Sequence, residues 1–345
     1  MRLKLIGFFI LYAIFFAPNL VHAEGGLLDR PVWPTIPSIQ AKVLILEYHS
    51  IGPIPNNAKW PDLYVKQATF DKQIKILQDL GLKSISFIDA IDNLKAGNFD
   101  CTNVVLTFDD GYLDNFTVGE KLNRINFGAT FYIPTAFPGK KFDDKGITYM
   151  SWNDIKKLDS IGFEIGSHTV NHIDLALASD TSIQFEVSQS KVDLNKQLSK
   201  IPKTFSIPLG AYTTGVIGEI EKYKFEGCVT SNRGLMDIEH IQKAPRIKIM
   251  ENTDLINVIT SYIRGNLKYK EEYKYGDNDS RIRSFRTILT RLGYPLQDSE
   301  KFDEPMMQAV IAFQKQFNLY PNGHLNHTTI DRMISDFVDL VASNS

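Results

Sequence analysis

The chain has little cysteine, no excess of basic charge, and no long apolar run beyond its N-terminal segment. Its 345 residues include two cysteines, too few for a disulfide scaffold or a four-thiolate metal site. Lys and Arg number 38 against 40 Asp and Glu, so the basic excess of a nucleic-acid-binding protein is missing. Hydrophobic residues make up 43% and charged residues 23%, which excludes a mainly disordered chain. The length predicts two domains.

The N-terminal segment is typical of a secretion signal. Two basic residues precede an apolar stretch over 5–17, and Val21-His22-Ala23 places a small residue before a cleavage point. The alternative is an uncleaved membrane anchor, but the stretch is shorter than the ~20 apolar residues of a spanning helix, and Pro18 ends it. We therefore expect a signal peptide over 1–23 and an exported mature chain of net charge −4 with no membrane span, either periplasmic or secreted to the cell wall.

Both cysteines would then enter an oxidising compartment. Cys101 and Cys228 each lie beside an apolar run that is predicted to be a buried strand, where a thiol packs as a small hydrophobic group. The sequence leaves open whether they form a disulfide.

From residue 40 to residue 260, short apolar β-branched runs alternate with helical patterns. Val43–Tyr48 is continuously apolar apart from Glu47, as a buried parallel strand requires. Further strands are predicted at 83–87, 104–108, 129–133, 163–165, 204–207, 227–230 and 246–249, and helices near 70–80, 116–126, 151–161, 180–199 and 214–223. This alternation predicts an α/β domain with parallel strands, in a barrel or an open sheet, whose chemistry lies where strands end.

The composition changes after this region. Residues 266–280 are charged and aromatic but nearly free of aliphatic side chains, which favours a linker. A helical pattern of apolar residues returns beyond it. We therefore expect an α/β domain over 24–265 and a small all-α domain over 281–345.

Two short motifs follow predicted strands and carry metal-ligating side chains. The first, Thr107-Phe108-Asp109-Asp110-Gly111, ends in two adjacent carboxylates that can take different roles, although aspartates there are also common as helix N-caps. The second is His168-Thr169-Val170-Asn171-His172, whose histidines at i and i+4 would share one helical face and bind one metal. Two imidazoles and one carboxylate form a facial triad with open positions.

These motifs resemble those of the polysaccharide deacetylases with a NodB-homology domain, carbohydrate esterase family four. The family's first motif matches 107–111 and its second matches 168–172, and the resemblance covers residues 40–260. It implies a distorted (β/α) barrel that binds Zn²⁺ or another divalent ion such as Co²⁺ or Ni²⁺. It also implies that Asp110, His168 and His172 are the metal ligands and that Asp109 is the general base.

The family's third motif, Arg-x-Pro-aromatic before a glycine, is altered here. The stretch Ser206-Ile207-Pro208-Leu209-Gly210 keeps the proline and the glycine but lacks the arginine and the aromatic residue. The resemblance assigns the backbone N–H of Leu209 to the oxyanion, because a backbone donor survives a change of side chain. Arg246 resembles the arginine found late in one branch of the family, and it would replace the missing arginine beside the base.

The family's late histidine, the usual catalytic acid, is also missing. Exported deacetylases of poly-N-acetylglucosamine resemble this chain in having an early Tyr-His, here Tyr48-His49, and the first and last strands of a barrel are neighbours. We therefore assign His49 as the general acid. A core histidine at a strand end is the structural alternative, and His240 is the other candidate for the acid.

The C-terminal part resembles a peptidoglycan-binding domain of the first type. Leu292-Gly293-Tyr294, the apolar positions from Ala309 to Phe313, and Leu319 to Gly323 follow that pattern over 276–340. Asp303 and Pro305 replace the usual glycine and threonine there, which weakens ligand binding as a prediction more than it weakens the fold. The alternative is a helical appendage that only packs on the first domain.

The combined prediction is a metal-dependent enzyme that hydrolyses N-acetyl groups of amino sugars in peptidoglycan or exported poly-N-acetylglucosamine. Trp152 and Tyr112 are candidates to stack on sugar rings, although aromatic residues near a site more often serve packing. Two alternatives remain: an inactive wall-binding protein, which the altered third motif favours, and an esterase that removes O-acetyl groups from a polysaccharide. The sequence does not choose between the two polymers.

Overall fold

The computed structural model describes residues 41–56, 58–142, 147–266 and 270–343. Seven parallel strands close into a barrel, because β1 pairs with β12 on one edge and with β5 on the other. In spatial order the strands are β1 (Ile45–Tyr48), β12 (Ala244–Lys248), β11 (Gly227–Arg233), β10 (Thr204–Ser206), β9 (Glu164–Ser167), β6 (Thr130–Ile133) and β5 (Asn103–Phe108). β4 (Lys83–Ile85) pairs with the first half of β5. The predicted barrel and the predicted contact between its first and last strands are confirmed.

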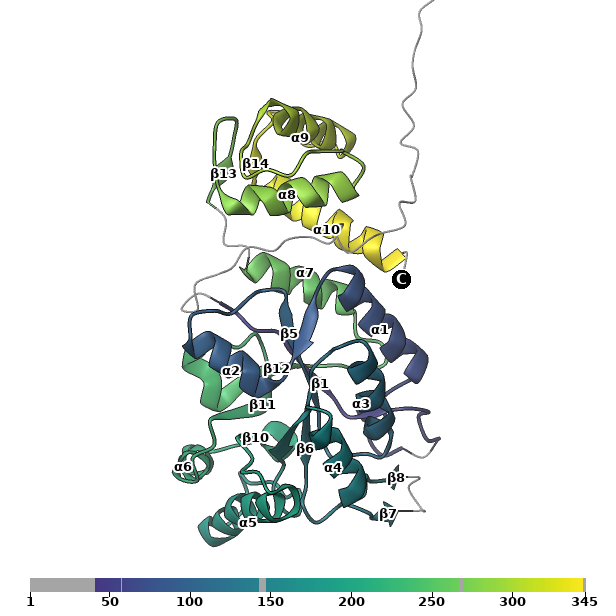
Figure 1. The fold of residues 1–345 in the computed structure, drawn as a ribbon, viewed down its shortest axis with the longest axis vertical. Helices are drawn as coiled ribbons and strands as arrows, with labels where there is room; N and C mark the ends of the chain where they lie inside the picture. Colours follow the sequence, from purple (N-terminus) through teal and green to yellow (C-terminus); the bar gives the residue numbers. More distant parts are fainter. Residues whose placement is uncertain (1–40, 57, 143–146, 267–269, 344–345) are drawn as a thin grey trace, which may run out of the picture.

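Helices surround the barrel (Figure 1). They are α1 (Gln67–Asp79), α2 (Phe87–Lys95), α3 (Asp114–Arg124), α4 (Trp152–Ser160), α5 (Asp180–Leu198), α6 (Thr214–Lys222) and α7 (Leu255–Asn266). The strand predicted over 83–87 is wrong at its end, because Ser86 caps α2 by accepting a hydrogen bond from the backbone N–H of Asp89. Shorter elements are β2 (Ser50–Ile51), η3 (Pro61–Leu63), β3 (Tyr64–Val65), β7 (Lys141–Phe142), β8 (Ile147–Thr148), η5 (Pro208–Gly210) and η6 (Ile238–Lys243).

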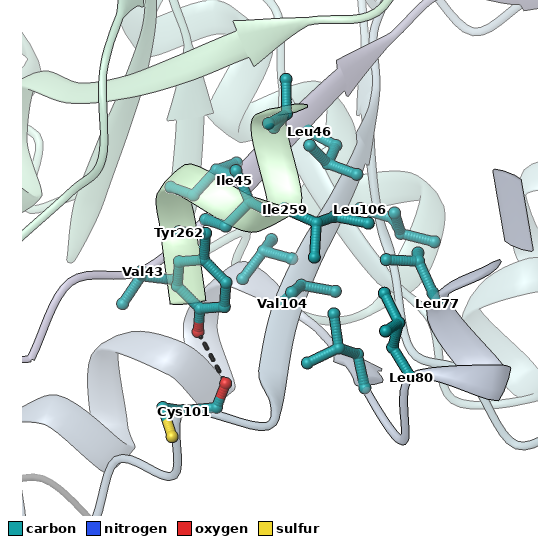
Figure 2. Close-up of a cluster of buried hydrophobic side chains, with 14 of the residues drawn as sticks. Val43, Ile45, Leu46, Leu77, Leu80, Cys101, Val104, Leu106, Ile259 and Tyr262 are labelled. Atoms are coloured by element: carbon teal, nitrogen blue, oxygen red, sulfur yellow. Dashed lines mark hydrogen bonds between the residues drawn. The ribbon is translucent and has the colours of Figure 1, made fainter. Parts of the chain in front are cut away.

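Figure 2 shows part of the core, in which aliphatic side chains of β1, β5, α1 and α7 lie beside Tyr262 and Cys101. Tyr262 of α7 is buried, and its hydroxyl lies 3.0 Å from the carbonyl oxygen of Cys101 and 2.9 Å from that of Asn103. Because Asn103 begins β5, these contacts fix α7 at the amino end of that strand. Cys101 and Cys228 are buried thiols, so no disulfide joins them.

The C-terminal part is mainly helical, as predicted. It contains α8 (Ser280–Arg291), α9 (Glu304–Gln316) and α10 (His327–Ser343), with an antiparallel pairing of β13 (Glu272–Tyr273) and β14 (Leu325–Asn326). These helices lie together at one end of the molecule beside α7 (Figure 1). Arg264 of α7 donates hydrogen bonds to the carbonyl of Asp331 and the hydroxyl of Ser335 in α10, at 3.0 and 3.2 Å.

Two predictions about chain segments fall partly or wholly outside the described residues. The signal peptide over 1–23 lies outside them. The expected linker, 266–280, includes β13, and its residues 267–269 are outside the described part. The domain boundaries stay a prediction. No described helix has the length and apolar character needed to span a membrane.

Candidate active site

The predicted site residues converge at the carboxyl end of the barrel. His49 follows β1, Asp109 and Asp110 follow β5, and His168 follows β9. These four residues, together with His172 and Leu209, line a single cavity of about 920 Å³. Carboxyl ends of parallel strands meet at one end of a barrel, so residues far apart in sequence become neighbours there.

Asp110, His168 and His172 form one group of facing ligand atoms. Oδ1 of Asp110 lies 3.4 Å from Nε2 of His168 and 3.1 Å from Nε2 of His172. The same oxygen is buried and accepts no hydrogen bond within the described residues. Burial raises the pKa of Asp110, but the neighbouring imidazoles outweigh it and hold the pKa well below its usual value. The carboxylate is therefore a charged acceptor aimed at two ring nitrogens.

The tautomer of the His168 ring follows from the contact that its Nδ1 atom makes. Nδ1 lies 2.8 Å from the backbone carbonyl oxygen of Ser206, which can only accept, so Nδ1 carries the proton. In the neutral ring the lone pair of Nε2 then faces the Asp110 carboxylate, an unfavourable arrangement unless a cation or proton lies between them. Two imidazoles and one carboxylate suit a divalent transition metal with open positions for water and substrate. These residues fit such an ion.

The two histidines do not lie on one helical face, so that prediction is wrong. They stand at either end of a turn after β9, in which Thr169 and His172 have φ of 67° and 55°. Left-handed backbone is costly for a β-branched residue such as Thr169. Glu186 of α5 compensates, because its buried carboxylate accepts hydrogen bonds from the backbone N–H groups of Val170 and Asn171, both at 2.8 Å. Glu186 thus stabilises the turn that holds His168 and His172 together.

Asp109 is bound by a buried arginine. The guanidinium of Arg246 donates to Oδ1 at 2.9 Å and to Oδ2 at 2.7 Å, and the hydroxyl of Ser206 donates to Oδ2 at 3.1 Å. Burial raises the pKa of Asp109, but the positive charge of Arg246 is the main opposing effect and lowers the pKa well below its usual range. Asp109 is therefore ionised and fixed in orientation.

Glu47 was not singled out from the sequence, although it is an acidic residue within an otherwise apolar strand. Its side chain is buried between the same arginine and His49: Oε2 lies 3.3 Å from Nε of Arg246, and Oε1 lies 3.9 Å from Nε2 of His49. Ser231 of β11 also donates to Oε1, at 3.1 Å. Glu47 and Asp109 thus share the charge of Arg246.

Leu209 lies at the cavity with an exposed side chain, 64% accessible, and φ of 59°. Asp110 and His172 also have positive φ. Together with Thr169 they make up half of the eight described non-glycine residues in that conformation. Strained backbone is therefore concentrated at this site.

The cavity wall carries aromatic side chains, only one of which was expected. Tyr112 stacks on Tyr149 at 5.5 Å between ring centroids, and Phe137 lies 6.3 Å from the ring of His172. Trp60, on the segment before η3, lines the cavity and is 59% exposed. Trp152 instead packs against the core as the first residue of α4.

His240, the other candidate for the acid, lies elsewhere. It belongs to η6, its ring nitrogen contacts the carboxylate of Asp237, and it is not among the residues that line the cavity. His49 is therefore the better placed of the two.

Both parts of the chain are similar to known proteins. Residues 96–228 match the family model "Polysaccharide deacetylase", and residues 278–333 match the model "Putative peptidoglycan binding domain". A Bacillus subtilis protein named "Putative polysaccharide deacetylase" is 27% identical over 198 residues, which cover 56% of this chain and 66% of that protein. Peptidoglycan-N-acetylglucosamine deacetylase of Bacillus cereus is 26% identical over 152 residues, which cover 44% of this chain and 51% of that protein.

The chain thus spans half to two-thirds of the length of these curated relatives. Among solved structures, the Streptococcus pyogenes deacetylase PplD in complex with acetate is similar, with a TM-score of 0.58 and 25% identity. That similarity covers 65% of this chain and 99% of the PplD chain.

Proposed function

We propose that this chain is an exported, metal-dependent enzyme that removes N-acetyl groups from amino sugars of a cell-wall glycan. The match of residues 96–228 to the polysaccharide deacetylase model supports the proposal. The observation that carries this proposal is the pairing of two groups in one cavity: Asp110, His168 and His172 as a metal-ligand set, and Asp109 as a fixed carboxylate beside them. The substrate is peptidoglycan or poly-N-acetylglucosamine, and the match of 278–333 to a peptidoglycan-binding model supports the former.

The ligand set would hold Zn²⁺ or a similar ion such as Co²⁺ or Ni²⁺. When bound, such an ion supplies Lewis acidity and lowers the pKa of a coordinated water from ~15.7 toward ~7. The chain supplies the remaining chemistry. Asp109, kept ionised by Arg246, accepts a proton from the attacking water while the oxygen of that water bonds to the acetyl carbon.

The leaving amine needs a proton, since an amide anion is a poor leaving group. His49, at the end of β1, lines the same cavity, and a ring nitrogen lies within 4.8 Å of the Asp109 carboxylate; we assign it this role. The backbone N–H of Leu209 is assigned to the developing oxyanion. The C–N bond breaks as the nitrogen takes the proton of His49, and the products are acetate and a free amine on the sugar.

The altered third motif does not by itself favour an inactive wall-binding protein. The arginine missing before Pro208 has a counterpart in Arg246, which binds the aspartate that needs orientation. Retention of a strained backbone at Asp110, Thr169 and His172 also supports an active site, because such strain persists where function requires it.

The test is acetate release by the zinc-loaded chain on peptidoglycan and on poly-N-acetylglucosamine, with Asp109→Asn as the inactive control. Release from either polymer that disappears in the control supports the proposal. Zinc bound at one equivalent without release from either would leave a wall-binding protein. Release only from O-acetylated glycans would make it an esterase.

A further inference from the structure

A second groove opens beside the catalytic cavity, between the ends of β11 and β12 and the first half of α7. Its volume is about 670 Å³. Leu235, Ile247, Met250 and Val258 give it apolar walls, and Arg233 lies at its edge with an exposed side chain.

The groove and the catalytic cavity meet at one residue. Lys248, at the end of β12, lines both of them. On the neighbouring strand β11, Ser231 lines the cavity and Arg233, two residues on, lines the groove. A glycan chain that places one sugar in the cavity can therefore continue past Lys248 toward Arg233.

The groove is cationic. Within the described part of the chain, neither Arg233 nor Lys248 has an acidic partner within ion-pair distance. Asp254 is the one acidic side chain among the lining residues, and its carboxylate already accepts hydrogen bonds from the backbone N–H and side-chain amide of Asn257. Two positive charges and the negative charge of Asp254 thus line the groove, a net charge of +1, and neither cation is taken up by an ion pair within the described residues.

We propose that this groove is a subsite for a carboxylate-bearing substituent of the glycan, so that the enzyme prefers peptidoglycan to poly-N-acetylglucosamine. The inference rests on the proposed function and deepens it. Muramic acid without a peptide carries a lactyl carboxylate; where a stem peptide is attached, that carboxyl is an amide and the peptide supplies the free carboxylates. Arg233 offers a planar fork that matches a carboxylate, and Lys248 adds a point charge. Poly-N-acetylglucosamine is neutral, and its deacetylated product is a cation that both side chains repel.

The experiment compares a neutral and an anionic substrate of equal length: fully N-acetylated chitotetraose and a peptide-free peptidoglycan tetrasaccharide. Variants are Arg233→Gln, Lys248→Gln and their double, and Lys243→Gln of η6 is the matched control, because it removes an exposed lysine outside both cavities. For the double variant we expect KM on the anionic substrate to rise about tenfold with little change in kcat. The KM ratio between the two substrates should therefore collapse. High salt should raise the wild-type KM on the anionic substrate alone.

Equal effects on both substrates, or an equal effect of Lys243→Gln, would overturn the subsite. Binding of both tetrasaccharides to the metal-free wild-type chain, measured by calorimetry, separates this inference from the proposed function. If the chain binds the anionic tetrasaccharide more tightly but releases acetate from neither, the subsite is supported and the proposed deacetylase function is overturned. If it releases acetate from both but binds them equally, the function is supported and the subsite is overturned. A tetrasaccharide that retains its stem peptide shows which carboxylate is bound. If it binds more tightly than the peptide-free tetrasaccharide, and the double variant loses that gain, the groove binds a carboxylate of the peptide.

Discussion

Arg246 and Asp109 form a buried, two-pronged ion pair, although 137 positions separate them in sequence. Arg246 comes from β12 and is 1% exposed, and its guanidinium reaches across the barrel to the end of β5. Its Nε also donates to the carbonyl of Thr230 and lies 3.3 Å from Glu47. One cation therefore contacts two buried carboxylates, and it fixes the plane of the one beside the proposed metal ligands.

Replacement of Arg246 is expected to damage both stability and activity. Arg246→Gln leaves Asp109 and Glu47 buried without a counter-charge, which should lower the free energy of unfolding by about 3–5 kcal/mol. Denaturant titration measures this loss. Arg246→Lys keeps the charge but not the fork, so it should lose less stability while acetate release still falls. Unchanged release in Arg246→Lys would contradict an orienting role.

His49 should matter for the reaction and not for metal binding. We expect His49→Gln to lower kcat on an N-acetylated oligosaccharide by about 10²–10⁴-fold, the usual contribution of a positioned proton donor. The zinc content per chain should stay at the wild-type value. His240→Gln is the matched control, since that histidine lies outside the cavity and its loss should leave kcat unaltered. A parallel loss of zinc in His49→Gln would assign His49 to the metal site instead.

Glu186 should support the metal site from a distance. Its carboxylate accepts hydrogen bonds from two backbone N–H groups and from the side-chain amide of Asn171, all within the turn between the two histidines. Glu186→Ala removes all three, so zinc affinity should fall about 10–100-fold, as for other residues that orient metal ligands. Competition with a chromophoric chelator measures it. The control is Glu219→Ala on α6, because the carboxylate of Glu219 pairs with Lys222 of the same helix. Equal affinity in Glu186→Ala and wild type would refute the anchoring role.

Tyr262 is expected to stabilise the fold without affecting the chemistry. Tyr262→Phe keeps the ring in the core of Figure 2 but removes the hydroxyl, whose one proton is within hydrogen-bonding distance of the carbonyl oxygens of Cys101 and Asn103. The free energy of unfolding should fall by about 1–3 kcal/mol. kcat should be retained below the unfolding transition, because the site lies at the other end of β5. A kcat loss without destabilisation would contradict this separation.

Most of the site was predictable because its residues lie next to strand ends, and the order of parallel strands places those ends together. Asp109, Asp110 and His168 needed only their motifs. The helical face predicted for His168 and His172 was wrong because spacing of i and i+4 does not distinguish a helix from a turn stabilised by a distant carboxylate. Glu186 could not be found in this way, since nothing near it in sequence marks its partners.

Neither Glu47 nor the helix α7 was predicted, although the sequence marks both. Glu47 is an acidic residue within an apolar strand, and a buried acid requires a buried cation. That cation, Arg246, lies 199 positions later in the sequence. The apolar spacing of Leu255, Val258, Ile259 and Tyr262 indicates a helix, and these residues are buried as such a pattern predicts. Of the two aromatic residues predicted near the site, Tyr112 lines the cavity, whereas Trp152 begins a helix packed on the core. Trp60 was missed because it lies in a segment without periodicity.

Trp60 should bind sugar by stacking. It is 59% exposed at the edge of the catalytic cavity, with Nζ of Lys59 4.3 Å from its ring centroid, and sugar rings present apolar C–H faces to aromatic side chains. We expect Trp60→Ala to raise KM on chitotetraose about tenfold, or ~1.4 kcal/mol, with kcat nearly unchanged, and Trp60→Phe to recover part of the loss. Phe185→Ala, which removes an exposed aromatic ring on α5, is the control. If Trp60→Ala instead lowers kcat at constant KM, the ring acts on the reacting geometry and not on binding, because an interaction made equally in the ground and transition states changes KM alone.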